Sequence, residues 1–116
     1  MTIRGTISDM CDCSIGTLPI EITFEEFKEV FDKDALLIDC RIAEEHEKNH
    51  IDSSILLPMQ QLSVRIQELE QHVNSSIYIY CRTGNRSCTF ARYLRTIGYA
   101  KSQSITGGFD TWGERI

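Results

Sequence analysis

Short apolar runs alternate with longer amphipathic stretches along the chain. The runs at 36–39, 55–57 and 77–80, with a weaker one at 104–106, have the length and composition of buried strands. The stretches between them have helical spacing. Alternating strands and helices are typical of a parallel sheet covered on both faces. The pattern therefore predicts an α/β domain with a mostly parallel central sheet.

The amphipathic stretches also indicate where helices begin and end. Thr23 and Glu26 have the spacing of a capping box, which places the start of the first helix after Thr23. A short helix is expected across 43–48. The helix that starts at Ser87 is expected to end at Gly98, which suits a C-terminal cap. The side chains expected to face the core are Phe24, Phe27, Val30 and Phe31, then Leu62, Ile66, Leu69 and Val73, and finally Phe90, Ala91, Leu94 and Ile97.

Composition and charge suit one small domain. The chain has 116 residues, 41% of them hydrophobic, and no long linker or repeat divides it. Residues 1–19 form a polar, candidate flexible extension, and 20–116 form the expected domain. Neither a secretory leader nor a membrane-length apolar segment is evident, so we expect a cytoplasmic protein without a membrane partner. A net charge of −5 argues against nucleic acid as a partner.

The segment Cys81-Arg82-Thr83-Gly84-Asn85-Arg86-Ser87 carries the strongest chemical signal. Cys81 follows the expected strand 77–80, so it lies at the sheet edge where parallel α/β folds bind ligands. Backbone N–H groups of a glycine-containing loop and the N-terminus of the next helix can converge on one anion. With the charges of Arg82 and Arg86, they should lower the pKa of Cys81 from about 8.5 toward or below neutrality. Cys81 is therefore the candidate nucleophile.

The spacing between Cys81 and Arg86 bears on the substrate. Tyrosine and dual-specificity phosphatases place five residues between their cysteine and arginine, in a loop wide enough for a phosphate. Here the intervening residues are the four from Arg82 to Asn85. The smaller ring suits a single sulfur atom carried on the cysteine as a persulfide. A phosphatase or an arsenate reductase is the less favoured interpretation of this loop.

Five segments of the chain occur together in an order known from one family. Besides the cysteine loop, they are Leu36-Leu37-Ile38-Asp39-Cys40-Arg41 with Glu44, Glu45 and His50-Ile51; Ile55-Leu56-Leu57-Pro58; Ala91 to Gly98-Tyr99; and Ile105-Thr106-Gly107-Gly108-Phe109 with Trp112. In this order and spacing they resemble the rhodanese-like domain of single-domain sulfurtransferases. The resemblance covers roughly 20–116. It implies a single α/β domain with a mostly parallel five-stranded sheet and helices on both faces.

Two departures from the family pattern concern the scaffold. Asn49 stands where the family usually has Gly before His-Ile, and 52–54 replace its Pro-Gly-Ala turn. Asn adopts the left-handed conformation of many helix C-termini more readily than other residues with a side chain. We therefore expect the fold to tolerate these changes.

The resemblance implies roles for the residues around Cys81. The substrate-binding set would be Arg82, Thr83, Gly84, Asn85, Arg86 and Ser87. Within it, Arg86 would close and brace the loop, and Arg82 would face the substrate. Asp39 and Arg41 are expected to pair near the end of their strand and to shape the pocket without reacting. No cofactor or metal is implied, and His46, His50 and His72 are expected in surface or capping positions.

The remaining cysteines are candidate secondary thiols, since five cysteines in an ordinary α/β pattern do not indicate a disulfide scaffold. Cys40 ends a neighbouring strand and lies on the same sheet edge as Cys81, which allows a disulfide or a sulfur relay. Cys88 could act as a resolving thiol, although packing within its helix is favoured. Cys11 and Cys13 could receive sulfur or bind metal, but zinc would need a second ligand pair.

Two functions fit these observations. The favoured one is a sulfurtransferase in which the Cys81 thiolate takes a sulfane sulfur from thiosulfate, a polysulfide or glutathione persulfide. The resulting Cys81 persulfide would pass that sulfur to a thiol or to cyanide, and an ionised thiolate needs no general base. The alternative is a module that carries sulfur to a protein partner, or docks on one, with little catalysis of its own. Both require a small anionic donor and a thiol acceptor.

Overall fold

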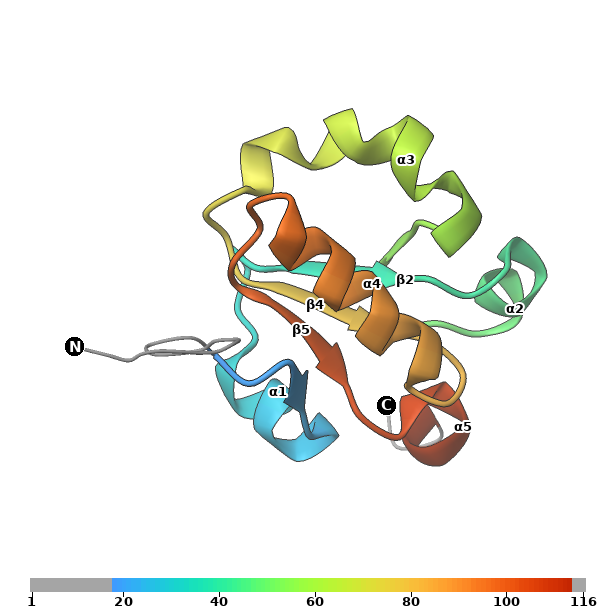
Figure 1. The fold of residues 1–116 in the computed structure, drawn as a ribbon. Helices are drawn as coiled ribbons and strands as arrows, with labels where there is room; N and C mark the ends of the chain where they lie inside the picture. Colours follow the sequence, from blue (N-terminus) through green and yellow to red (C-terminus); the bar gives the residue numbers. More distant parts are fainter. Residues whose placement is uncertain (1–17, 114–116) are drawn as a thin grey trace.

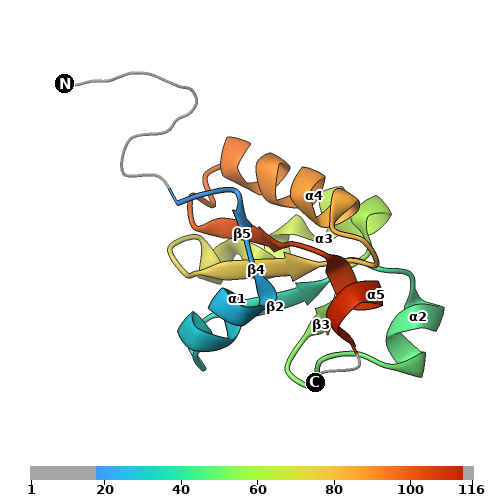
Figure 2. The same cartoon turned by 90° about the horizontal axis from the view of Figure 1, so that it is seen from below.

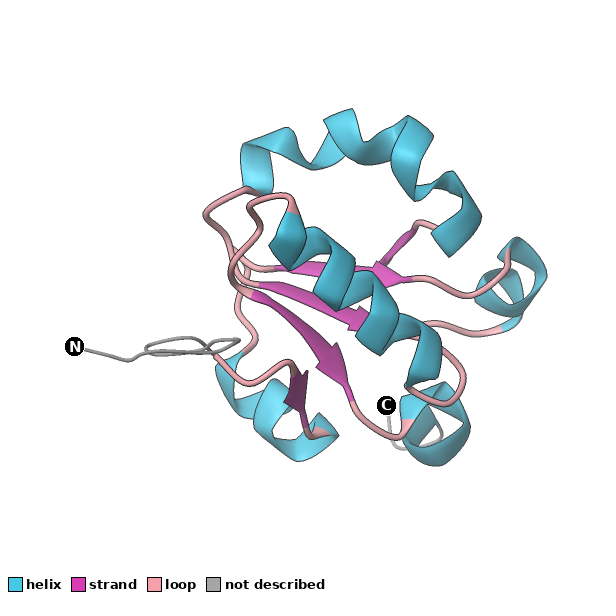
Figure 3. Ribbon diagram, viewed as in Figure 1, coloured by secondary structure: helices cyan, strands magenta, loops and turns pink. Residues whose placement is uncertain are grey.

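The structure, a computed structural model, describes residues 18–113. Cys11, Cys13 and nearly all of the predicted extension lie outside the described residues. Figure 3 shows that the strands form the middle layer and the helices surround them. With η denoting a 3₁₀ helix, the elements are β1 (Glu21–Ile22), α1 (Phe24–Val30), β2 (Leu36–Asp39), α2 (Ala43–Lys48), β3 (Ile55–Leu56), η1 (Met59–Gln61), α3 (Leu62–Arg65), η2 (Ile66–His72), β4 (Ile77–Tyr80), α4 (Asn85–Thr96), β5 (Ser102–Ile105) and α5 (Gly108–Trp112).

The sheet has five strands in the order β1-β5-β4-β2-β3, and every neighbouring pair is parallel. This confirms the predicted α/β class and parallel sheet. The strand predicted at 104–106 begins earlier, at Ser102. Its first residues, Ser102, Gln103 and Ser104, are polar although they are buried, so the apolar pattern did not reveal them. The two-residue strand β1 has too short an apolar pattern to be recognised from the sequence.

Alternation along the strands divides the core between the two faces of the sheet. In β2 and just after it, Ile38 and Cys40 belong to one buried cluster, whereas Leu37 belongs to the other. The first cluster includes residues of α3, η2 and α4, and the second includes residues of α1 and α5. Figures 1 and 2 show α4 and α5 on opposite sides of the sheet. Both faces are therefore covered, as the family resemblance implied.

Helix boundaries follow from local capping. The capping box at α1 is confirmed, because Glu26 N–H donates to Thr23 Oγ1 and Thr23 N–H donates to Glu26 Oε1, each at 3.1 Å. Helix α4 begins at Asn85, two residues before the predicted start, because Gly84 ends the loop with a left-handed φ of 99°. Three side chains expected in the core are instead exposed, since they lie near helix ends: Val30, Val73 and Ile97.

The segment predicted as one helix over 62–73 consists of α3 and η2, preceded by η1. Its predicted inward face is correct at Leu62 and Leu69, which are buried. Spacings of three and four residues bring side chains to one side in 3₁₀ turns as well as in α-helical turns. The hydrophobic pattern therefore located the buried face without determining the hydrogen-bonding pattern.

Asn49 differs from the expectation of a left-handed cap. It ends α2 in an extended conformation, with φ −166° and ψ 139°. In this conformation its carbonyl oxygen accepts a hydrogen bond from Arg41 Nη2 at 2.6 Å. A side chain is easily accommodated there, which explains why glycine is not required. Within 18–113, no helix has the length and apolar character needed to cross a membrane.

Candidate active site

The carboxyl ends of three neighbouring strands bring the site together. In register, Asp39 of β2 is paired with Tyr80 of β4, and Cys40 N–H donates to Tyr80 O at 3.0 Å. Cys40 and Cys81 are therefore adjacent as the strands end, and both belong to the buried cluster beneath α4. Ser104 of β5 completes this edge, since its register partner is Ile79.

The loop from Cys81 to Ser87 wraps around the sulfur. Gly84 N–H donates to Cys81 Sγ at 3.0 Å and Ser87 N–H donates to it at 3.4 Å. The Ser87 hydroxyl lies 3.6 Å from the same sulfur. Because Ser87 is in the first turn of α4, the sulfur also lies at the positive end of that helix. The predicted cradle for an anion is therefore present, with the Cys81 sulfur at its centre.

The turn at Gly107-Gly108 supports this loop from outside. Phe109 N–H donates to Cys81 O at 2.7 Å, and Asp110 N–H donates to Arg82 O at 2.9 Å. The approach is so close that a Cβ on Gly108 would lie 2.2 Å from Arg82 O. Contact at this distance excludes every residue except glycine, so the shape of the cysteine loop depends on a turn more than twenty residues downstream.

Ser87 links the loop to the sheet on its inner side. Its hydroxyl donates to Gly84 O at 3.1 Å and lies 2.6 Å from Ser104 Oγ. Both serines are fully buried. The role of Ser104 was not recognisable from the sequence, because a serine in a weakly apolar run gives no sign that it faces a loop seventeen residues away.

Hydrogen bonds make Cys81 an acidic thiol. The strongest influence is the hydrogen bond from the Cys40 side chain, and burial opposes it. Contacts from Ser87 and from loop backbone N–H groups act in the same direction as Cys40, and together they lower the pKa of Cys81 to about 4. The pKa of Cys40 is raised, first by its hydrogen bond to Cys81 and then by burial. The direction predicted for Cys81 agrees with this, but Cys40, rather than the two arginines, is the main cause.

This arrangement predicts the pH dependence of Cys81 alkylation. Lowering the pKa favours the thiolate above it, so the rate with iodoacetamide should stay near its neutral value until the pH approaches about 4. Below that pH, the rate should fall about tenfold per unit, because only the thiolate reacts. Peptide mapping after short exposures measures the profile for each cysteine. Cys40→Ala should move the midpoint upward by about one unit or more. A wild-type midpoint near that of a free thiol would contradict the prediction.

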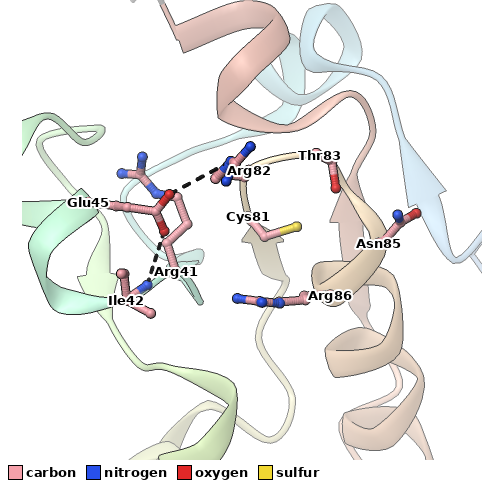
Figure 4. Close-up of a pocket in the computed structure, with 8 residues that line it drawn as sticks. All are labelled: Arg41, Ile42, Glu45, Cys81, Arg82, Thr83, Asn85 and Arg86. Atoms are coloured by element: carbon pink, nitrogen blue, oxygen red, sulfur yellow. Dashed lines mark hydrogen bonds and ion pairs between the residues drawn. The ribbon is translucent and has the colours of Figure 1, made fainter.

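A pocket of about 470 Å³ opens over the sulfur, and Figure 4 shows the residues around it. The lining residues are Arg41, Ile42, Glu45, Cys81, Arg82, Thr83, Asn85 and Arg86. They come from the end of β2, from α2, from the cysteine loop and from the start of α4. Of the loop residues predicted to bind substrate, Gly84 and Ser87 contact the sulfur from within, and the other four line the pocket.

The two loop arginines both line the pocket but have different surroundings. Arg82 Nε lies 3.2 Å from an Asp110 carboxylate oxygen and 3.8 Å from one of Glu45, so its charge is balanced. Within the described part of the chain, the Arg86 side chain forms no hydrogen bond and no ion pair with a carboxylate. Figure 4 shows its side chain extending beside Cys81. The Arg86 charge is therefore unpaired beside the sulfur, while ion pairs link Arg82 to α2 and α5.

Asp39 and Arg41 pair as predicted, and His46 joins them. Arg41 Nη2 donates to Asp39 Oδ2 at 2.8 Å, and His46 Nδ1 lies at the same distance from that oxygen. Burial alone would raise the pKa of Asp39, but hydrogen bonds from Arg41 and His46 hold it below its usual value. The Arg41 guanidinium also packs 4.1 Å from the ring centroid of Phe109. His46 was expected in a surface or capping position; it is instead half-buried on α2, with its ring against the Asp39 carboxylate.

The two other predicted thiols among the described residues, Cys40 and Cys88, lie in different places relative to Cys81. Cys40 lies in the same buried cluster as Cys81, whereas Cys88 is half-buried on α4. All three cysteines among the described residues are free thiols. In the same part of the chain, no group of three His, Cys, Asp or Glu side chains could hold a metal ion.

A parallel α/β sheet with an acidic cysteine at the end of a central strand, held by a loop and a helix N-terminus, defines a class of thiol-dependent domains. The model of the family described as "Rhodanese-like domain" matches residues 23–115. The chain therefore belongs to the rhodanese-like family.

Individual relatives agree with this assignment. The chain is 36% identical over 94 residues to the "Putative sulfur carrier protein YrkF" of Bacillus subtilis, covering 79% of this chain and 50% of that protein. It is 32% identical over 80 residues to a "Sulfurtransferase" of Allochromatium vinosum, covering 69% and 73%. The crystal structure of a rhodanese-like domain protein from Staphylococcus aureus superposes with a TM-score of 0.71 at 28% identity, covering 80% and 90%. For several curated relatives, the chain spans only 25% to 50% of their length.

Proposed function

We propose that this chain is a sulfurtransferase that carries a sulfane sulfur as a persulfide on Cys81. The observation that supports this most directly is the Cys81 thiolate held by Gly84 and Ser87 N–H groups at 3.0 and 3.4 Å. Donors fixed in this way can stabilise negative charge on a sulfur atom as an oxyanion hole does on oxygen. The names of the relatives, which refer to sulfur carriage and sulfur transfer, point to the same chemistry.

The first half-reaction loads the cysteine. The Cys81 thiolate attacks the outer sulfur of thiosulfate, a new S–S bond forms, and the bond within thiosulfate breaks to release sulfite. No proton has to be removed, since the nucleophile is already ionised. The loop N–H groups and the helix N-terminus would hold the negative outer sulfur in the pocket.

The second half-reaction unloads it. Cyanide attacks the outer sulfur and leaves as thiocyanate, and an acceptor thiolate would instead leave as a persulfide. Each route restores the Cys81 thiolate, so initial rates should show a ping-pong pattern. A polysulfide or glutathione persulfide would load Cys81 by the same displacement, with a thiolate as the leaving group.

Intact mass spectrometry tests this proposal directly. After incubation with thiosulfate and removal of the donor, the chain should gain one sulfur atom, mapped to Cys81, and cyanide should remove it as thiocyanate. Multiple turnovers would indicate a sulfurtransferase. A single loading with negligible turnover would indicate the alternative, a carrier for a protein partner. A folded, reduced protein that gains no sulfur from thiosulfate or glutathione persulfide would refute both.

The surroundings of the two arginines predict which one binds an anionic donor. Arg86→Ala removes the unpaired charge and should raise the KM for thiosulfate about tenfold, a loss typical of one charge-assisted contact. Arg82→Ala should raise it less than about threefold, because Glu45 and Asp110 already balance that charge. Steady-state kinetics at fixed cyanide measures both. An increase in KM for Arg82→Ala that equals or exceeds the increase for Arg86→Ala would contradict this prediction. It would mean that the Arg82 ion pairs open when the donor binds.

A further inference from the structure

The proposed persulfide has a second thiol beside it. Cys40 is 2% exposed and so cannot be reached by a bulky acceptor, and its backbone is not part of the cysteine loop. We propose that Cys40 is a resolving thiol, which attacks the inner sulfur of the Cys81 persulfide and releases the outer sulfur as hydrosulfide. This inference rests on the proposed persulfide at Cys81. It gives the domain a further activity, the reductive release of sulfide.

The sheet geometry suits a bond between the two cysteines. Both follow the registered pair of Asp39 and Tyr80 on neighbouring parallel strands, and the hydrogen bond from Cys40 N–H to Tyr80 O shows that pairing continues to this point. Neighbouring strands are about 4.8 Å apart, within the Cα separation of about 4.4 to 6.8 Å found for disulfides. Both side chains lie in the buried cluster beneath α4, so they are on the same face of the sheet.

The step balances without an outside oxidant. Cys40 Sγ forms a bond to Cys81 Sγ, the bond from Cys81 Sγ to the outer sulfur breaks, and the proton of Cys40 leaves with that sulfur as HS⁻. The outer sulfur gains two electrons, and each cysteine sulfur gives up one. The product is a disulfide between Cys40 and Cys81. Two equivalents of an external thiol then reduce this disulfide and return the protein to its starting state.

The resting site keeps Cys40 from reacting early. The neighbouring Cys81 sulfur and burial both raise the pKa of Cys40, so Cys40 stays protonated beside the thiolate. Once Cys81 carries an outer sulfur, the charge moves away from Sγ to that sulfur. The inner sulfur then becomes an electrophile. At the same time, the negative charge that raises the pKa of Cys40 lies farther from it.

Two exits for the sulfur then compete. An acceptor in the pocket attacks the outer sulfur, while Cys40 attacks the inner sulfur from the core side of the same bond. The acceptor route is bimolecular and the Cys40 route is intramolecular. Abundant acceptor should therefore favour transfer, and scarce acceptor should favour sulfide release.

The test compares wild type with Cys40→Ser, whose hydroxyl keeps a hydrogen-bond donor but cannot form a disulfide. Both are loaded with thiosulfate under anaerobic, mildly alkaline conditions, freed of donor, and followed by intact mass and by a sulfide assay. Thiosulfate is chosen because loading releases sulfite, so that any sulfide comes from the protein. Cys88→Ser serves as the matched control on α4, and a wild-type sample without thiosulfate controls for adventitious oxidation.

In wild type we expect gain of one sulfur, then its loss, a final mass two hydrogens below the starting mass, one hydrosulfide per chain, and a peptide joining Cys40 to Cys81. Cys88→Ser should behave in the same way. Cys40→Ser should gain sulfur, form no disulfide and hold the sulfur about tenfold longer or more. If Cys40→Ser does not fold, Cys40→Ala replaces it, and the wild-type peptide map remains decisive.

Two failures can be distinguished. If wild type holds its sulfur as long as Cys40→Ser and transfers it to cyanide, the resolving role is wrong and the proposed sulfurtransferase stands. If wild type, folded and reduced, neither gains sulfur nor forms thiocyanate, the proposed function itself fails.

Discussion

Cys81→Ser should abolish sulfur transfer and leave the fold intact. A serine hydroxyl remains protonated in the same cradle and cannot carry sulfur through an S–S bond. We expect kcat/KM for thiocyanate formation to fall at least about a thousandfold, as happens when a nucleophile is removed. The change is nearly isosteric, so the fold should persist, but loss of the stabilised thiolate should lower the free energy of unfolding at neutral pH. Steady-state assays and urea unfolding measure the two quantities.

Cys88→Ser is the matched control for that experiment. Cys88 is close in sequence but half-buried on α4, and it does not line the pocket. Its replacement should leave kcat/KM within about twofold of wild type, since surface-like substitutions away from special features have small effects. Substantial thiocyanate formation by Cys81→Ser would mean that another thiol carries the sulfur.

Gly108→Ala should damage both activity and stability. Its φ of 67° is unfavourable for alanine, and the new Cβ would lie 2.2 Å from Arg82 O and 2.5 Å from Thr83 N. Relief of this contact requires the turn and the cysteine loop to separate, at a cost of about 3 kcal/mol or more in unfolding free energy. Displacing the loop N–H groups by about 1 Å should lower kcat/KM about a hundredfold.

Gly98→Ala is the control for Gly108→Ala, because it introduces backbone strain at a positive φ without a contact to the cysteine loop. Gly98 has a φ of 109°, but a Cβ there would meet nothing within 4 Å, and it lies at the far end of α4. This variant should lose about 1 to 2 kcal/mol of stability and keep its activity. Equal activity losses in the two variants would show that general destabilisation, and not the loop contact, explains the effect of Gly108→Ala.

The sequence was informative where structure is determined locally. The apolar run 77–80, the glycine in the loop and the amphipathic stretch after it predicted the strand, the turn and α4 that place Cys81. The capping box at Thr23 is also local, and it was found. In each case the residues that decide the structure lie within a few positions of one another, so periodicity and turn chemistry reveal them.

Features that depend on contacts between distant segments were missed or misjudged. Arg82 pairs with Asp110, which is 28 residues away, so its charge could not be known to be balanced. The predicted strand was shorter than β5, because the first residues of β5 are polar and are buried only through contacts with α4 and β4. The effect of Cys40 on the pKa of Cys81 depends on the register of β2 and β4. This register places side by side two cysteines that are 41 positions apart in the sequence.

The acidity of Cys81 also has a consequence for folding. In the unfolded chain this thiol should titrate near its usual pKa of about 8.5, whereas the native cradle lowers the pKa to about 4. Between these values, the unfolded state binds one more proton than the native state at this position. The contribution of Cys81 to stability is therefore complete above the unfolded pKa and disappears as the pH falls through the folded one. Proton uptake on unfolding, followed with and without Cys81→Ser, thus gives a thermodynamic measure of how strongly the cradle prefers an anion.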